Sequence, residues 1–129
     1  MSNLKTYRVS YEDIEFAEVT LQVDHDVLTP ALATEINDFW GMCTHRLSAQ
    51  NGDVVQTVIR MFGVAAINRF LAIGGGDFVG HEAKHIEYWT QQVIDHEGEG
   101  WPPLAELGIL LIRADVHIGD YFDATLEAL

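Results

Sequence analysis

The segment His81-Glu82-Ala83-Lys84-His85 carries the clearest chemical signal in the sequence. Two histidines four residues apart on one helix can bind zinc, and the glutamate between them can activate the zinc-bound water, as in zinc proteases. In such an enzyme, however, the residues between the glutamate and the second histidine are uncharged because the helix is buried, and here one of them is the charged Lys84. His96 lies about 16 Å further along the predicted helix, too far away to serve as a third ligand. We therefore favour an exposed, solvated helix face over a catalytic zinc site.

Two other groups combine carboxylates with an imidazole, and both types of side chain bind metal ions. One is Asp24-His25-Asp26, which follows a predicted strand, and the other comprises Asp115, His117, Asp120 and Asp123. Neither group has the spacing of an EF-hand calcium loop. We interpret both as solvated turns, and we predict no metal or other cofactor.

An acidic segment between Glu12 and Asp26 contains six carboxylates and no lysine or arginine. Such uncompensated charge steers basic partners and competes for surfaces that otherwise bind phosphate. It also favours solubility, which is the alternative interpretation. We predict that a partner binds these carboxylates: Glu12, Asp13, Glu15, Glu18, Asp24 and Asp26.

The whole chain shares this negative charge. In 129 residues it has 20 acidic against 7 basic side chains and a net charge of −13, which disfavours direct binding to nucleic acid. The single cysteine, Cys43, allows no intramolecular disulfide and is typical of the cytoplasm. The longest apolar stretch, residues 58–73, is interrupted by charged and amide side chains, and no apolar run lies near the N-terminus. We therefore expect neither a membrane span nor a signal peptide.

Alternation of apolar and polar residues predicts the strands that position these side chains. Residues 6–11 and 18–24 alternate and should pair as an antiparallel hairpin. Residues 109–118 alternate again. In this last strand the predicted inward residues are Leu110, Ile112, Ala114, Val116 and Ile118, whereas Ile109 and Leu111 are predicted to face outward.

Helices should fill the space between the strands. Thr29-Pro30 is a typical helix start, and an apolar stripe from Leu32 to Leu47 predicts one continuous helix. Asp53 should cap a second helix over residues 54–73, which the glycines at 74–76 end. A third helix is predicted from about Asp77 to residues 96–98.

The order strand-strand-helix-helix-helix-strand predicts an α+β fold, a single domain over residues 1–129 with its helices packed on one face of a small antiparallel sheet. The other face should be open and polar: Arg8, Glu18, Thr20, Gln22, Asp24, Arg113, Asp115 and His117. The predicted core includes large apolar side chains from every element: Leu21, Val23, Ile36, Phe39, Phe62, Phe70, Trp89 and Ile112.

Two segments, EVTLQVDHDVLTPALATEINDFW at 18–40 and GWPPLAELGI at 100–109, resemble an uncharacterised family of small proteins from bacteriophages and prophage regions. The shared motifs are structural, namely a strand, a Thr-Pro helix start and a Trp-Pro-Pro turn, and they carry no catalytic residues. The resemblance implies a small accessory product of a mobile element, a class that includes inhibitors of host defence systems.

Together these features favour a non-enzymatic interaction protein in the cytoplasm of a bacterial host cell. Its partner should be a host protein with a basic surface. In its most specific form the protein would inhibit a nucleic-acid-binding defence complex, as anti-CRISPR proteins do. Two alternatives stay open: a small zinc-dependent hydrolase using His81, Glu82 and His85, and a structural or assembly protein. A homo-oligomer also stays open.

Overall fold

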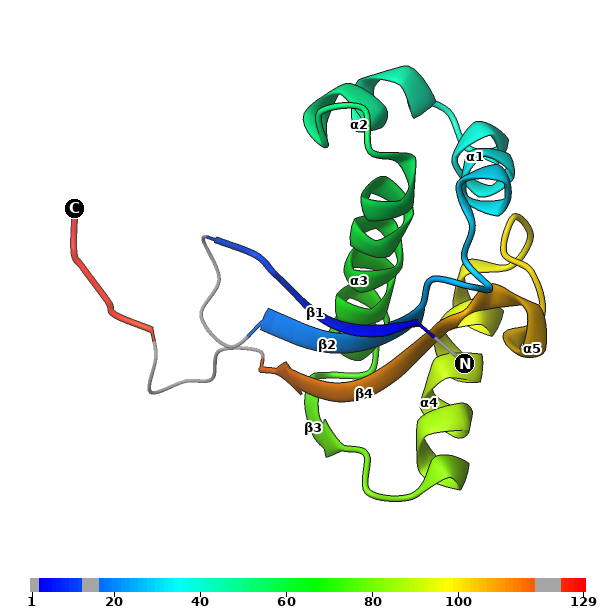
Figure 1. Ribbon diagram of the computed structural model, residues 1–129. Coiled ribbons are helices and arrows are strands. Elements are labelled where there is room, and N and C mark those ends of the chain that lie inside the picture. Colours follow the sequence, from blue (N-terminus) through cyan, green and yellow to red (C-terminus); the bar gives the residue numbers. More distant parts are fainter. Residues whose placement is uncertain (1–2, 13–16, 118–123) are drawn as a thin grey trace.

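The structure is a computed structural model that describes residues 3–12, 17–117 and 124–129. In these residues four strands form one antiparallel sheet in the order β1-β2-β4-β3, as Figure 1 shows. The strands are β1 (Leu4–Ser10), β2 (Ala17–Asp24), β3 (Gly76–Val79) and β4 (Ile109–Val116). The helices are α1 (Pro30–Phe39), α2 (Cys43–Ala49), α3 (Val54–Ala72), α4 (Ala83–Glu97) and α5 (Leu104–Leu107). The predicted α+β class is confirmed.

The central helix, α3, begins where the sequence predicts. The carboxylate of Asp53 accepts a hydrogen bond from the backbone N–H of Gln56 at 3.0 Å. The helix packs against β1, β2, β4, α1 and α4. By length and composition α3 could also cross a membrane, but this packing is that of a core helix. A Cβ atom at residue 63 would collide with the Val9 side chain, so α3 can approach β1 this closely only because Gly63 has no side chain.

Most of the predicted core residues meet in one cluster. Five of them are buried, Leu21, Val23, Ile36, Phe62 and Phe70, and Trp89 packs against them. The prediction is wrong for Phe39 and Ile112. Phe39 is 54% exposed, and Ile112 is only half-buried.

Phe39 is exposed because the predicted helix over residues 32–47 is interrupted. The backbone turns at residues 40–42, where Met42 adopts a left-handed conformation with φ of 67°. The Arg46 guanidinium then donates to the carbonyl oxygens of Asn37, Trp40 and Gly41, around the point where α1 ends. A side chain from the following helix therefore stabilises the break, and the apolar spacing gives no sign of it.

The third helix starts later than predicted because a fourth strand precedes it. Asp77 lies in β3, not in a helix, and α4 begins at Ala83. The backbone N–H of Gly80 donates to the carbonyl oxygen of Ile112 at 2.8 Å, which extends the pairing beyond β3. A Cβ at residue 80 would lie 2.5 Å from the Ile86 side chain, so only glycine fits between α4 and β4.

A β-bulge changes which residues of β4 face the core. Thr20 pairs with Arg113, whereas the next residue, Leu21, pairs with Leu111, so Ile112 is an extra residue in the strand. The alternation therefore shifts by one residue at this point. Ala114 and Val116 are buried as predicted, but Ile109 and Leu111 are buried too, and Leu110 and Ile112 are only half-buried. Ile118 lies outside the described residues.

Helix α4 also covers the edge of β4 that the short strand β3 leaves unpaired. The fully buried hydroxyl group of Thr90 accepts a hydrogen bond from the backbone N–H of Leu111 at 2.9 Å. The same hydroxyl donates to the carbonyl oxygen of Ile86 at 2.7 Å. One threonine thus satisfies a strand N–H that would otherwise be buried without a partner.

We expect Thr90→Val to lower the free energy of unfolding by about 1–3 kcal/mol, because valine keeps the shape of threonine but leaves the Leu111 N–H unsatisfied. Urea unfolding followed by circular dichroism measures the change. The control is Thr34→Val, since the exposed Thr34 hydroxyl bonds only to its own helix, at Pro30. Equal stability of the two variants would contradict a role for Thr90 at the strand edge.

Candidate functional site

In the part of the chain that the structure describes, no helix packs on the face of the sheet opposite α3 and α4. Helix α3 packs against three of the strands and α4 against β4, whereas no side chain on the opposite face of β2 or β4 is fully buried. This open face carries the polar residues that the sequence predicts in β1 and β2: Arg8, Glu18, Thr20, Gln22 and Asp24. From β4 it carries Leu110, Ile112, Arg113 and Asp115, with Leu110 in place of the predicted Ile109 and Leu111 because of the bulge.

Three carboxylates stand side by side across this open face. Asp115 in β4 is directly opposite Glu18 in β2 and directly opposite Asp77 in β3. We call Glu18, Asp115 and Asp77 the carboxylate row. Like charges at directly opposed positions destabilise a sheet, by up to about 1 kcal/mol per pair. Such a row is therefore costly for folding and needs compensation by cations.

Two cationic or proton-donating groups of the protein partly compensate the row. The Arg8 guanidinium lies 3.5 Å from the Glu18 carboxylate, and both side chains are exposed, so this ion pair adds little stability. At the other end, His117 Nε2 lies 2.9 Å from Asp77 Oδ1 and 2.8 Å from Asp115 Oδ1. These last three residues each place one ligand atom within 4.8 Å of the others, an arrangement that could hold a metal ion.

The predicted partner-binding carboxylates do not form one patch. Glu18 belongs to the carboxylate row, and Glu12 lies at the hairpin end of the sheet, just beyond β1. Asp24 and Asp26 are at the opposite end of β2, about 20 Å away along an extended strand. The other two predicted residues, Asp13 and Glu15, lie outside the described residues.

The Asp24-His25-Asp26 group has a structural role at the end of β2. Asp24 Oδ1 accepts the backbone N–H of Asp26 at 2.9 Å, which closes the turn. His25 Nε2 is 2.7 Å from the hydroxyl oxygen of Tyr7 and so links the turn to β1. Burial raises the pKa of the Tyr7 hydroxyl, and the nearby carboxylate of Asp53 raises it further. The hydroxyl therefore stays protonated and available to this link.

The HEAKH segment does not have the geometry that its sequence suggests. Glu82 is the residue that precedes the first turn of α4, and its carbonyl oxygen accepts the backbone N–H of His85. His81 lies before the helix, so the two imidazoles do not project from successive turns of one helix. Both histidines are exposed. The predicted helix is wrong for His81 and Glu82, because β3 and its extension through Gly80 precede them and α4 begins only at Ala83.

The residue that sequence reasoning missed is Asp77. It was assigned to a helix start, whereas the register of β3 places it beside Asp115 and His117. The alternation of β4 sets Asp115 and His117 on the same face, but the four residues of β3 are too few to give a periodic signal for Asp77. The other two carboxylates of that sequence group, Asp120 and Asp123, lie outside the described residues.

The fold and this site define a small α+β protein with a helix-covered sheet face and an open, carboxylate-bearing one. Comparison with known families then places it. A model of the family described as "Protein of unknown function (DUF2528)" matches residues 18–126, and the chain belongs to this family.

Curated relatives extend over the whole chain. The chain is 32% identical over 131 residues to protein ea10 of Escherichia phage lambda, and the alignment covers 99% of each protein. The same values hold for the lambda prophage-derived protein ea10 of Escherichia coli O6:H1 strain CFT073. The predicted resemblance to a phage and prophage family is confirmed. No solved structure matches the chain.

Proposed function

We propose that this protein is a non-enzymatic, phage-encoded interaction protein that binds a basic protein surface in the cytoplasm of a bacterial host. The observation that carries the proposal is the carboxylate row of Glu18, Asp115 and Asp77 on a sheet face that none of the described helices covers. The sheet holds these like charges together although their repulsion opposes folding. A basic partner is the macromolecule that such a row attracts.

The charge of the whole protein supports the same class of partner. With a net charge of −13, its long-range field attracts basic surfaces and repels phosphate backbones. Basic surfaces of host proteins commonly serve to bind nucleic acid. We therefore propose as the most specific function that the open face occupies such a surface on a nucleic-acid-binding defence complex and keeps nucleic acid away from it. The phage origin of the curated relatives agrees with such a role.

The test compares two variants that lose the same number of charges. One variant replaces the row, with Glu18→Gln, Asp115→Asn and Asp77→Asn. The control replaces three exposed helix carboxylates away from the sheet: Glu35→Gln, Glu87→Gln and Glu106→Gln. Proteins captured by the immobilised wild type from bacterial lysate are identified, and their association rates with all three proteins are measured by biolayer interferometry.

We expect a partner whose association with the row variant is about tenfold slower than with the wild type, whereas the control stays within about twofold. Binding should weaken as salt rises from low to physiological strength, and duplex DNA should compete with it. If both variants lose binding equally, net charge rather than the row attracts the partner. If neither variant changes the rate, the open face is not the binding surface.

A further inference from the structure

We propose that Asp77, Asp115 and His117 form a binding site for a divalent transition-metal ion, with Zn²⁺ as the best-suited probe. The site combines two carboxylate oxygens with one imidazole nitrogen, and all three atoms lie within 4.8 Å of one another. They come from two paired strands, since Asp77 is in β3 and Asp115 is in β4. Among the described residues, this is the one group of three metal-ligating side chains whose ligand atoms lie so close together.

The distances agree with a shared coordination sphere. Zinc binds histidine nitrogens and carboxylate oxygens at about 2.0–2.2 Å in a tetrahedral arrangement, so two of its ligand atoms lie about 3.4 Å apart. His117 Nε2 is 2.9 Å from Asp77 Oδ1 and 2.8 Å from Asp115 Oδ1. An ion could therefore contact all three atoms with little movement of the strands. Exposure of Asp77 and His117 leaves room for water as further ligands.

Both carboxylate oxygens approach the same nitrogen of His117. Nε2 carries a single hydrogen, which two carboxylate oxygens on opposite strands must share. Glu18 adds a third negative charge on the far side of Asp115. A divalent ion would bind both oxygens and the Nε2 lone pair, with the imidazole hydrogen on Nδ1, and would offset the repulsion within the row. The imidazole favours a transition metal over Mg²⁺ or Ca²⁺, which prefer oxygen ligands.

This inference goes beyond the proposed function, because it concerns the isolated protein and needs no partner. The experiment is isothermal titration of Zn²⁺ into chelator-treated, dialysed protein, together with the melting temperature with and without Zn²⁺. We expect one ion per chain and a higher melting temperature in its presence. Mutation of residues that merely orient a metal ligand costs about 10–100-fold in affinity, so His117→Ala and Asp77→Asn should weaken zinc binding by about tenfold or more.

The chain provides a matched control in its other pair of histidines. His81→Ala with His85→Ala removes two exposed imidazoles and should leave zinc binding unchanged. Circular dichroism of the zinc-free variants checks that they fold, and Mg²⁺ in excess should not displace Zn²⁺. Zinc binding that survives His117→Ala, or that disappears in the His81/His85 variant, would overturn the proposal, as would the absence of one tightly bound ion in the wild type.

The His117→Ala variant also separates this inference from the proposed function. It removes the imidazole ligand but keeps Glu18, Asp115 and Asp77, and hence the carboxylate row. Loss of zinc binding with unchanged partner binding would support the metal site whatever the fate of the docking surface. If the row variant still binds its partner at the wild-type rate, the proposed docking surface is wrong. That outcome leaves the zinc-binding result of His117→Ala unaffected.

Discussion

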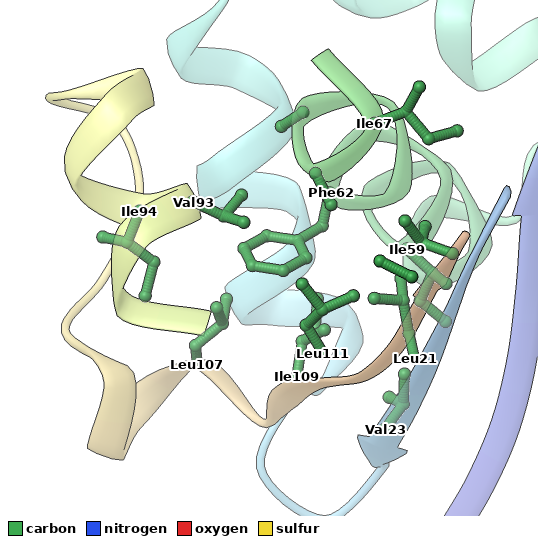
Figure 2. Close-up of a cluster of buried hydrophobic side chains, with 14 of the residues drawn as sticks. Leu21, Val23, Ile59, Phe62, Ile67, Val93, Ile94, Leu107, Ile109 and Leu111 are labelled. Atoms are coloured by element: carbon green, nitrogen blue, oxygen red, sulfur yellow. The ribbon is translucent and has the colours of Figure 1, made fainter. Parts of the chain in front are cut away.

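Replacing Phe62 with alanine should lower the free energy of unfolding by about 3–5 kcal/mol, the largest loss that we expect from a single substitution in this chain. The Phe62 ring is fully buried, and it packs edge-to-face with the Trp101 ring, with centroids 5.2 Å apart. Figure 2 shows the ring between side chains of α4, α5 and β4: Val93, Leu107 and Leu111. Alanine would leave a cavity that neighbours from several elements cannot close without moving.

Phe39 provides the matched control, because the sequence places both phenylalanines in the core and the structure does not. Phe39 is 54% exposed at the end of α1, so Phe39→Ala should cost less than about 1 kcal/mol. Urea unfolding of both variants, followed by tryptophan fluorescence, measures the two values. Similar losses would mean that Phe39 packs in the core and that α1 continues past residue 39.

Elements with local signals in the sequence were predicted well. Strands β1 and β2 alternate in a regular way, and α1 and α3 begin at residues whose side chains cap them. The Thr29 hydroxyl accepts the Leu32 N–H at 3.2 Å, and Asp53 does the same for Gln56. Such caps depend on residues three positions apart, and a single sequence is sufficient to find them.

Elements that depend on distant contacts were not predictable in this way. The bulge at Ile112 belongs to the pairing of β4 with β2, and the short strand β3 pairs with β4, with the Gly80–Ile112 hydrogen bond beyond it. Four residues of β3 are too few to show a period of two. Because β3 was not predicted, Asp77 was predicted to lie in a helix, and one of the three residues of the carboxylate row was missed.

The residues of the candidate site were therefore only partly predictable, and their arrangement was not. Glu18 was predicted as a partner-binding residue and Asp115 as an exposed residue, because both belong to strands with clear alternation. Their juxtaposition required the β2–β4 pairing, which joins residues almost a hundred positions apart. The carboxylates of the acidic segment likewise lie at the two ends of β2, because β2 is eight residues long. A count of charges along the sequence does not show this separation.

The break between α1 and α2 leads to the second large effect, which centres on Arg46. Its guanidinium donates to Asn37 Oδ1 at 3.0 Å and to the Asn37 carbonyl oxygen at 3.1 Å, besides the carbonyls of Trp40 and Gly41. Asn37 is buried at 2% exposure, and its amide nitrogen donates in turn to the Cys43 carbonyl oxygen at 3.1 Å. One arginine thus ends α1 and fixes the start of α2.

We expect Arg46→Met to lower the free energy of unfolding by about 2–4 kcal/mol. Methionine keeps much of the aliphatic stem but leaves the Asn37 side chain and the last carbonyls of α1 without their charged donor, and hydrogen bonds of charged groups contribute about 1.5–3 kcal/mol each without adding fully. The positive charge also interacts favourably with the C-terminus of α1. Thermal and urea unfolding measure the loss.

Arg60→Met is the control, because it removes the same charge from the same groove between α2 and α3 but only one exposed hydrogen bond, to Gln50 Oε1 at 2.9 Å. It should cost less than about 1 kcal/mol. Arg46→Lys adds a second comparison, since a lysine ammonium cannot span several carbonyls and the Asn37 oxygen as the planar guanidinium does. If Arg46→Lys kept full stability, charge alone would be sufficient and the geometry of the guanidinium would not define the break. If Arg46→Met and Arg60→Met cost the same, the break would depend on the packing of the two helices and not on Arg46.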